Sequence, residues 1–276
     1  MLMRKNTIEI VPYSRNYEVF VSSIIPKDWS LDFRRFIYLY QNCSYFHAYI
    51  IKFYKVAVGY GNLLCFGNIA WIGNLVIKKA FRGLGLGSIL LQHLIELGKN
   101  KGIRTFNLVS TSVGISLYQK FGFEPEFRYC FYKTPPACGG QIINTRLSRA
   151  KREDIVAIAK FDKMISGEYR EEFIESHLAG IYVIRSNEKK LSGFLIESLE
   201  DGLILAEEPD SGIELLKTKT QSNGGRVVIP ECNHYAMNYL ENNGFSYCTS
   251  LNRMRLGKKY KWKPECVYNR GSGYCG

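Results

Sequence analysis

The chain of 276 residues lacks several features that mark common classes of protein. It has no apolar run as long as a membrane span, and its start, MLMRKNTIEI, is not followed by the apolar stretch of a signal peptide. Its eight cysteines include no C-x-x-C pair, and none has a histidine partner at zinc spacing. These absences predict a cytoplasmic protein with buried or incidental free thiols and no bound metal.

Acidic residues are scarce in the first half of the chain. Residues 1–133 hold 17 Lys and Arg against 7 Asp and Glu, whereas residues 134–276 hold 20 against 18. The positive charge of the first half would favour an anionic ligand. Nucleic acid or a ribosome is one such partner, but the basic residues are scattered rather than grouped in blocks, which disfavours it.

A loop with very little side chain lies near residue 85. The sequence LVIKKAFRGLGLGSILLQHL (75–94) has three glycines at alternate positions. The run before it, IAWIGNLVI (69–77), predicts a buried strand, and apolar residues at helical spacing predict a helix over 88–100. A glycine-rich loop that leads into a helix presents unpaired N–H groups and the positive end of the helix dipole. The segment therefore has the outline of a phosphate site.

Two nucleotide motifs do not fit this loop. A P-loop requires Gly-Lys-Ser/Thr at its end, whereas this loop ends GLGS, without a lysine. In a dinucleotide fingerprint the third glycine comes one residue later, and an acidic residue follows about twenty residues on. The corresponding region here, GIRTFNLVST, has no carboxylate.

Two motifs in order resemble the GNAT N-acetyltransferase superfamily. NLVIKKAFRGLGLG resembles the family's strand and its R/Q-x-x-G-x-G/A loop, which holds the pyrophosphate of acetyl-CoA. At the expected distance, SLYQKFGFE (116–124) is similar to the family's LYEKxGFE. The resemblance implies an acetyl-CoA-dependent N-acetyltransferase. Its acceptor would be a primary amine of a small molecule, protein or peptide, which attacks directly in a ternary complex.

The chain repeats this pattern after a break at KTPPACGGQ (133–141). In the second half, a short strand and a helix capped near Ser148 are expected first, followed by three strands, a helix at about 210–222, a further strand and a last helix. The stretches TSVGISLYQKFGF (111–123) and NHYAMNYLENNGF (233–245) share their length and their Gly-Phe ending, which indicates duplication. The tail resembles that of tandem GNAT proteins at Trp262, Pro264, Val267, Tyr268, Ser272 and Gly276.

We therefore expect an α+β fold with two tandem GNAT domains, each a mixed, mostly antiparallel sheet flanked by helices. The expected limits are 1–134 for the acetyl-CoA domain, 135–141 for a linker and 142–276 for a degenerate second domain. The second domain has Glu207 and Glu208 where phosphate would lie, and Leu240 in place of Tyr118. Carboxylates repel phosphate, so one CoA per chain is expected.

The resemblance also implies roles for residues of the first half. The backbone of the strand at Leu75 to Ile77 would pair with pantetheine, and the Ile77 N–H would stabilise the oxyanion. Tyr118 would be the acid that protonates the departing thiolate, and Thr111 occupies the position of an Asn that contacts the cofactor in many members. The expected cofactor-binding residues are Leu75, Val76, Ile77, Arg82, Gly83, Leu84, Gly85, Leu86, Gly87, Ser88 and Thr111.

The general base is not assigned. Many members of the family carry a glutamate on the strand before the loop, whereas this chain has Trp71, Gly73 and Asn74 at those positions. His47, Glu124 and Glu126 are other titratable residues within reach, but structural roles suit them better. The missing base keeps open a non-catalytic acyl-CoA-binding or regulatory protein, and the charge keeps open an RNA- or ribosome-associated one. The acceptor and a homodimer also stay open.

Overall fold

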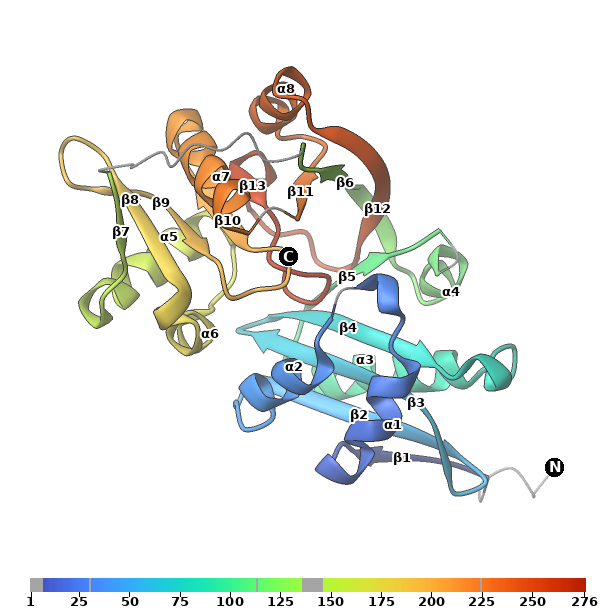
Figure 1. The fold of residues 1–276 in the computed structure, drawn as a ribbon. Coiled ribbons are helices and arrows are strands. Elements are labelled where there is room, and N and C mark those ends of the chain that lie inside the picture. Colours follow the sequence, from blue (N-terminus) through green and yellow to red (C-terminus); the bar gives the residue numbers. More distant parts are fainter. Residues whose placement is uncertain (1–6, 30, 113, 136–145, 224) are drawn as a thin grey trace.

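The computed structural model describes residues 7–29, 31–112, 114–135, 146–223 and 225–276. These residues form an eight-stranded and a five-stranded sheet with helices packed against them (Figure 1). No helix in the described ranges is long and apolar enough to cross a membrane. Most of the break that the sequence places at 133–141 lies outside the described residues.

The first half contributes six strands and four helices. The predicted strand at 69–77 is observed with these limits, and the predicted helix begins two residues early, at Leu86. In Figure 1, α1 and α2 lie in front of the sheet and α3 lies behind it. The elements are β1 (Ile8–Pro12), α1 (Glu18–Ile24), α2 (Phe33–Tyr40), β2 (Phe46–Phe53), β3 (Val56–Phe66), β4 (Ile69–Ile77), α3 (Leu86–Asn100), β5 (Thr105–Ser110), α4 (Ile115–Lys120) and β6 (Glu124–Lys133).

The expected elements of the second half are observed in order, but one helix start was wrong, and a short helix at 171–176 and strands at 246–257 and 267–269 were not expected. Ser148 does not cap a helix, because it lies in a short strand and the helix begins seven residues later, at Ile155. The Asp154 side chain just before this helix accepts a bond from the Lys151 N–H. The elements are β7 (Leu147–Arg149), α5 (Ile155–Ser166), α6 (Glu171–Ser176), β8 (Ile181–Arg185), β9 (Leu191–Ile196), β10 (Leu203–Ala206), α7 (Pro209–Asn223), β11 (Arg226–Pro230), α8 (His234–Asn242), β12 (Ser246–Gly257) and β13 (Val267–Asn269).

The two halves exchange strands. The eight-stranded sheet has the order β1-β2-β3-β4-β5-β12-β6-β11, so β12 of the second half lies between β5 and β6 of the first. In turn, β6 pairs with β11 of the second half, antiparallel from Arg226↔Lys133 to Pro230↔Tyr129. The five-stranded sheet, β13-β10-β9-β8-β7, belongs to the second half alone. The expected limits 1–134 and 142–276 stay a prediction, and strands from both ranges share the eight-stranded sheet.

Buried charges hold the second half against the first. The Arg170 guanidinium donates to both carboxylate oxygens of Asp162, and its Nη1 donates to the Cys275 carbonyl at 2.8 Å. The side chain of Arg170 is 3% exposed and that of Asp162 is fully buried. Glu168 lies beside Arg170 and accepts a bond of 2.8 Å from the Trp71 indole on β4. This cluster joins α5, the C-terminal segment and the central sheet.

Removing one charge of this pair should cost much more than removing an exposed one. We expect Asp162→Asn to lower the free energy of unfolding by about 3–5 kcal/mol, because it leaves the Arg170 guanidinium buried without its main counter-ion. Glu188→Gln, which breaks an exposed pair with Lys190, should change it little. Urea unfolding of the full chain measures both. Equal effects of the two substitutions would contradict this account of the cluster.

Candidate functional site

The glycine loop lies open at the N-terminus of α3. Gly83 and Gly85 have left-handed φ angles of 81° and 76°, and Gly85 is the residue that caps α3. A Cβ at either glycine would meet no atom within 4 Å, so the space in front of the loop is free of protein. Nonglycine residues rarely adopt such angles, which explains the glycines. Loop and helix together leave several N–H groups unpaired toward that space.

A bulge in β4 opens the sheet beside this loop. Tyr60 pairs with Val76 and Asn62 with Gly73, so Asn74 and Leu75 together stand opposite the single residue Gly61 of β3. Asn74 has a φ of 51°, and its amide nitrogen donates to Asn62 Oδ1 at 2.9 Å. The parallel pairing of β4 with β5 ends at Trp71↔Asn107. Beyond that pair, no other residue in the described part of the chain pairs with the edge of β4 that faces β5.

The backbone of Ile77 faces this unpaired edge. The Lys78 N–H donates to the Val58 carbonyl of β3 at 2.8 Å. Because successive N–H groups of a strand point to opposite sides, the N–H and carbonyl of Ile77 point away from β3. The Ile77 carbonyl accepts a bond of 3.0 Å from Arg82 Nε, so the exposed Arg82 is anchored between the end of the strand and the loop.

Helix α4 brings Tyr118 near the same loop. Leu117 Cδ2 lies 3.8 Å from the Cβ position of Gly87, which places α4 against the start of α3. The Tyr118 ring meets Phe123 edge-on, with 5.8 Å between ring centroids. Burial raises the pKa of Tyr118 to about 12, so the phenol keeps its proton at neutral pH. Thr111 follows β5 and is exposed. The predicted site residues thus come from β4, the loop, α3 and α4.

Comparisons with known proteins identify the family. Models of an acetyltransferase (GNAT) domain match residues 44–125 and residues 158–269. A Bacillus subtilis protein, to which [ribosomal protein bS18]-alanine N-acetyltransferase activity is ascribed, is 32% identical over 112 residues, covering 40% of this chain and 72% of that protein. The chain belongs to the GNAT acetyltransferases. N-alpha-acetyltransferase 30 of Schizosaccharomyces pombe is 28% identical over 140 residues, covering 46% of this chain and 86% of that protein.

Solved structures share the whole GNAT-like fold. A Pyrococcus horikoshii protein to which acetyltransferase activity is ascribed superposes with a TM-score of 0.80 at 22% identity, over 98% of this chain and 96% of that one. A tandem GNAT protein from the clavulanic acid biosynthesis pathway gives 0.62 at 12% identity, over 92% and 99%. The predicted tandem GNAT fold is therefore confirmed. Members of this family use acetyl-CoA as the acetyl donor, and the open loop, bulge and unpaired edge fit that ligand.

The other face of β4 meets the C-terminal segment, residues 262–276. A Cβ at Gly73 would lie 2.4 Å from the Tyr274 Cβ. Tyr274 therefore occupies the space that a side chain at position 73 of β4 would need. Nearby, the rings of Tyr13 and Tyr60 lie edge-on at 6.0 Å. The hydroxyls of both tyrosines and the Asn62 amide nitrogen are buried without a partner among the described residues. The bulge thus has buried polar groups on the side away from α3.

The carboxylates considered as bases are engaged elsewhere. Glu124 and Glu126 bind Arg255, and Glu126 also binds Arg253. His47 lines a different cavity, at the far end of β2. Sequence reasoning missed Glu200, whose oxygens accept bonds of 2.7 and 2.6 Å from the Tyr274 hydroxyl. Burial raises the pKa of Glu200 to about 7. Only the three-dimensional contact of Tyr274 with Gly73 connects this carboxyl with the GNAT strand.

In the second half, the C-terminal segment fills the corresponding opening. The order β10–α7–β11–α8–β12 repeats β4–α3–β5–α4–β6, but β13 pairs with β10 on the side facing β11. The Arg270 N–H donates to the Val228 carbonyl of β11 at 2.8 Å, and the Val228 N–H donates to Asn269 Oδ1 at 2.6 Å. Peptide groups of the chain itself therefore pair along the edges that are free in the first half.

Tyr268 anchors this segment on α7. A Cβ at Gly212 would lie 2.3 Å from the Tyr268 ring, so Gly212→Val should displace the ring and lower the free energy of unfolding by about 1–3 kcal/mol. Gly273→Val, in the same segment with no atom within 4 Å of its Cβ, should have a much smaller effect. Urea unfolding compares the two variants. A Gly212 variant as stable as the original chain would show that Tyr268 is not a tight anchor.

Proposed function

We propose that the first half transfers an acetyl group from acetyl-CoA to a primary amine by direct attack in a ternary complex. The observation that carries this proposal is the bulge at Asn74, which frees one edge of β4 beside an open glycine loop. Acetyl-CoA would supply a thioester whose carbonyl carbon is attacked by the amine. The chain must therefore hold the donor, orient the amine, stabilise an oxyanion and protonate a thiolate.

Backbone groups would hold the donor. The amides from Gly83 to Ser88, together with Arg82, would bind the pyrophosphate, since N–H groups and the dipole at a helix start favour anions. The free edge at Leu75, Val76 and Ile77 would pair with the pantetheine arm as a neighbouring strand does. The Ile77 N–H points to this edge and is the candidate oxyanion donor, and Thr111 would contact the arm from β5.

Tyr118 is the candidate acid. A phenol with a pKa of about 12 is protonated at neutral pH and can give its proton to a thiolate as the thiolate leaves. The Tyr118 side chain is partly buried and packs edge-on against Phe123. The approaching amine must be neutral, and the described part of β4 offers no carboxylate to deprotonate it. An amine of low pKa would suit such a site.

An α-amino group at the N-terminus of a protein or peptide is the favoured acceptor. Its ordinary pKa is about 8, well below the 10.4 of a lysine side chain, so a useful fraction is neutral without a strong base. Two relatives are named for N-alpha and alanine N-acetylation, which supports the same class.

The loop assignment can be tested with a matched pair of glycines. Gly85 and Gly102 both have left-handed φ angles and no atom within 4 Å of their Cβ, but Gly102 lies at the other end of α3. Changing either to Val should cost similar backbone strain. Only Gly85→Val should abolish CoA binding in calorimetric titration, because its side chain would occupy the pyrophosphate position. Wild-type chain should bind one CoA, and normal binding by Gly85→Val would refute the loop assignment.

The acid assignment predicts a loss of turnover without a loss of binding. Tyr118→Phe should lower kcat by about 10²- to 10⁴-fold and leave CoA affinity nearly unchanged, since the ring packing persists. The control is Tyr239→Phe on α8, the equivalent helix of the second half, where Tyr239 packs on Phe245. Release of free CoA in the presence of peptides with free α-amino groups measures both. Equal turnover in the two variants would leave Tyr118 with a packing role only.

A panel of amines separates this function from a regulatory one. Acetylation of peptide α-amino groups, with kcat/KM rising up to about pH 8, supports the proposal. CoA binding without turnover on α-amino, lysine or small-molecule amines would favour a non-catalytic acyl-CoA-binding protein instead. Absence of CoA binding would end both assignments.

A further inference from the structure

Two basic segments that lie far apart in the sequence meet at one end of the central sheet. The end of α3 and the turn after it, residues 98–104, contact residues 257–263, which begin with the last residue of β12. The Lys258 N–H donates to the Arg104 carbonyl at 3.2 Å, and Thr105 Oγ1 donates to the Lys258 carbonyl at 2.7 Å. The basic patch formed in this way consists of Lys99, Lys101, Arg104, Lys258, Lys259 and Lys261, all exposed.

No carboxylate neutralises the basic patch. None of its six cations forms an ion pair with a described residue, and the two segments contain no Asp or Glu. Lys263, just beyond, is paired with Glu207 at 3.1 Å. The C-terminal carbonyls of α3 favour Lys99 and Lys101, but they cannot account for the cations after β12. Six like charges on one surface repel each other unless an anion binds.

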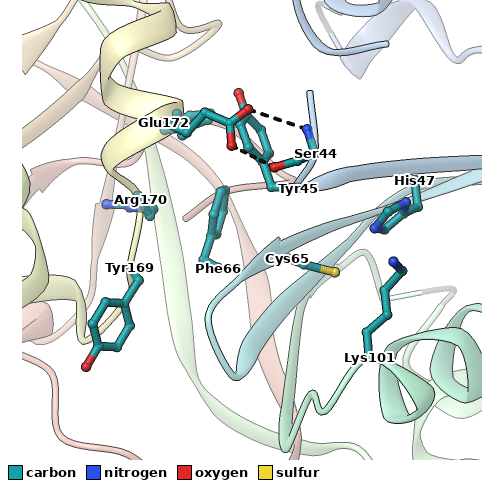
Figure 2. A pocket seen from close by; sticks show the side chains of 10 residues that line it. Ser44, Tyr45, His47, Cys65, Phe66, Lys101, Tyr169, Arg170 and Glu172 are labelled. Carbon is teal, nitrogen blue, oxygen red and sulfur yellow. Dashed lines mark hydrogen bonds between the residues drawn. The ribbon is translucent and has the colours of Figure 1, made fainter. Parts of the chain in front are cut away.

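An aromatic cavity adjoins the basic patch (Figure 2). It has a volume of about 390 Å³, and Lys101 forms part of its wall together with His47 and Tyr169. Phe66 and Tyr45 lie at its base, and Tyr169 is 59% exposed at its rim, packed over the Gly67 turn. Burial and the nearby Lys101 lower the pKa of His47, so this wall holds a neutral imidazole at pH 7.

The second basic segment passes close to the stretch of chain that carries Tyr169. A Cβ at Gly167 would lie 2.7 Å from the Lys261 carbonyl, and Gly167 is two residues from Tyr169. Lys163 Nζ lies 3.9 Å from the centre of the Tyr169 ring. Glu172, which accepts bonds from the Ser44 N–H and hydroxyl, stands on the wall away from Lys101, and Glu171 is its neighbour. Lys101 of the basic patch and the exposed ring of Tyr169 thus line the same cavity, and Glu172 lies on the side of the cavity away from Lys101.

The basic patch cannot serve the CoA phosphates. Helix α3 has 15 residues between the glycine loop and Lys101, which corresponds to about 22 Å. Screening at physiological salt reduces interactions between exposed charges over more than about 8 Å. An anion that binds at this end of α3 would therefore be separate from the CoA phosphates.

We propose that the basic patch and the adjoining cavity bind a single-stranded polynucleotide. The lysines would contact phosphates, and Tyr169 would stack on a base that enters the cavity. A positive surface that follows a backbone, with an aromatic ring beside it, is how proteins bind single strands without reading sequence. An anionic membrane suits the site less well, because the aromatic side chains Tyr45 and Phe66 line a cavity and do not project from the surface to insert into lipid. An acidic protein would need no stacking ring.

The test is fluorescence anisotropy of the full chain with labelled oligouridine and oligothymidine of about twelve nucleotides. Two triple variants are compared. The patch variant carries Lys101→Gln, Lys258→Gln and Lys261→Gln. The control variant carries Lys55→Gln, Lys133→Gln and Lys189→Gln, which removes the same charge from exposed lysines that have no ion-pair partner among the described residues. Between about 50 and 200 mM salt, the slope of log affinity should fall by about 2 in the patch variant only. At the low salt, its affinity should fall at least about ten-fold.

The stacking role has its own control. Tyr169→Ala should weaken oligonucleotide binding by about five-fold or more, whereas Tyr169→Phe should retain it, since every base can stack on a phenyl ring. Tighter binding of oligouridine than oligothymidine would identify RNA as the source of the strand, and the reverse would identify DNA. Equal weakening in both triple variants, no oligonucleotide binding by wild type, or binding to phosphatidylserine vesicles alone would overturn the proposal. Acetyl transfer should be unchanged in every variant, so failure here leaves the proposed enzyme intact.

Discussion

The pairing of β12 with β5 and β6 is the contact on which the rest of the molecule depends. From Asn252↔Ser110 to Gly257↔Thr105 it completes the sheet of the first half, and on its other edge it holds β6. Because β6 also pairs with β11, each half depends on a strand from the other. Two GNAT folds joined only by a linker could move independently, whereas these two share a sheet and a core. A single core cluster contains Phe66 of β3 and Phe194 of β9.

This exchange determines what the duplicated half can still do. The strand order keeps β10 and β11 in the positions that correspond to β4 and β5, but β13 lies between them and bonds to both. The asymmetry of the halves therefore rests on backbone pairing as well as on the carboxylates of Glu207 and Glu208. The same segment continues to Tyr274, which packs on Gly73 of β4. One stretch of chain thus closes the opening of the second half and forms a wall beside the opening of the first.

Local features of this protein could be predicted from sequence, and features that depend on distant pairing could not. Apolar runs and glycine spacing gave β4, the loop and α3 within two residues, because strand, left-handed turn and helix each have a short-range pattern. Ser148 was misplaced because the expected short strand extends through Arg149 and a 3-10 turn at Arg152–Asp154 precedes the helix, which moves the start of the helix to Ile155. The bulge at Asn74 and the position of β12 have no local signal. The role of each predicted site residue stays a prediction, since it concerns a ligand as well as a fold.

The distribution of charge also could be predicted only in part, because the sequence shows which residues are basic but not which of them lie together in the fold. In the sequence, the basic residues of the first half are scattered. Their positive charge can be interpreted as a field that attracts the CoA phosphates. In the fold, the antiparallel pairing of β5 with β12 brings Lys101 and Arg104 beside Lys258. These residues lie about one length of helix α3 away from the glycine loop. At the loop itself, Arg82 contacts the strand end through the Ile77 carbonyl, and neutral N–H groups would bind most of the phosphate charge. Binding of the donor should therefore depend on backbone geometry more than on net charge, while the basic patch at the other end is left for a separate polyanion.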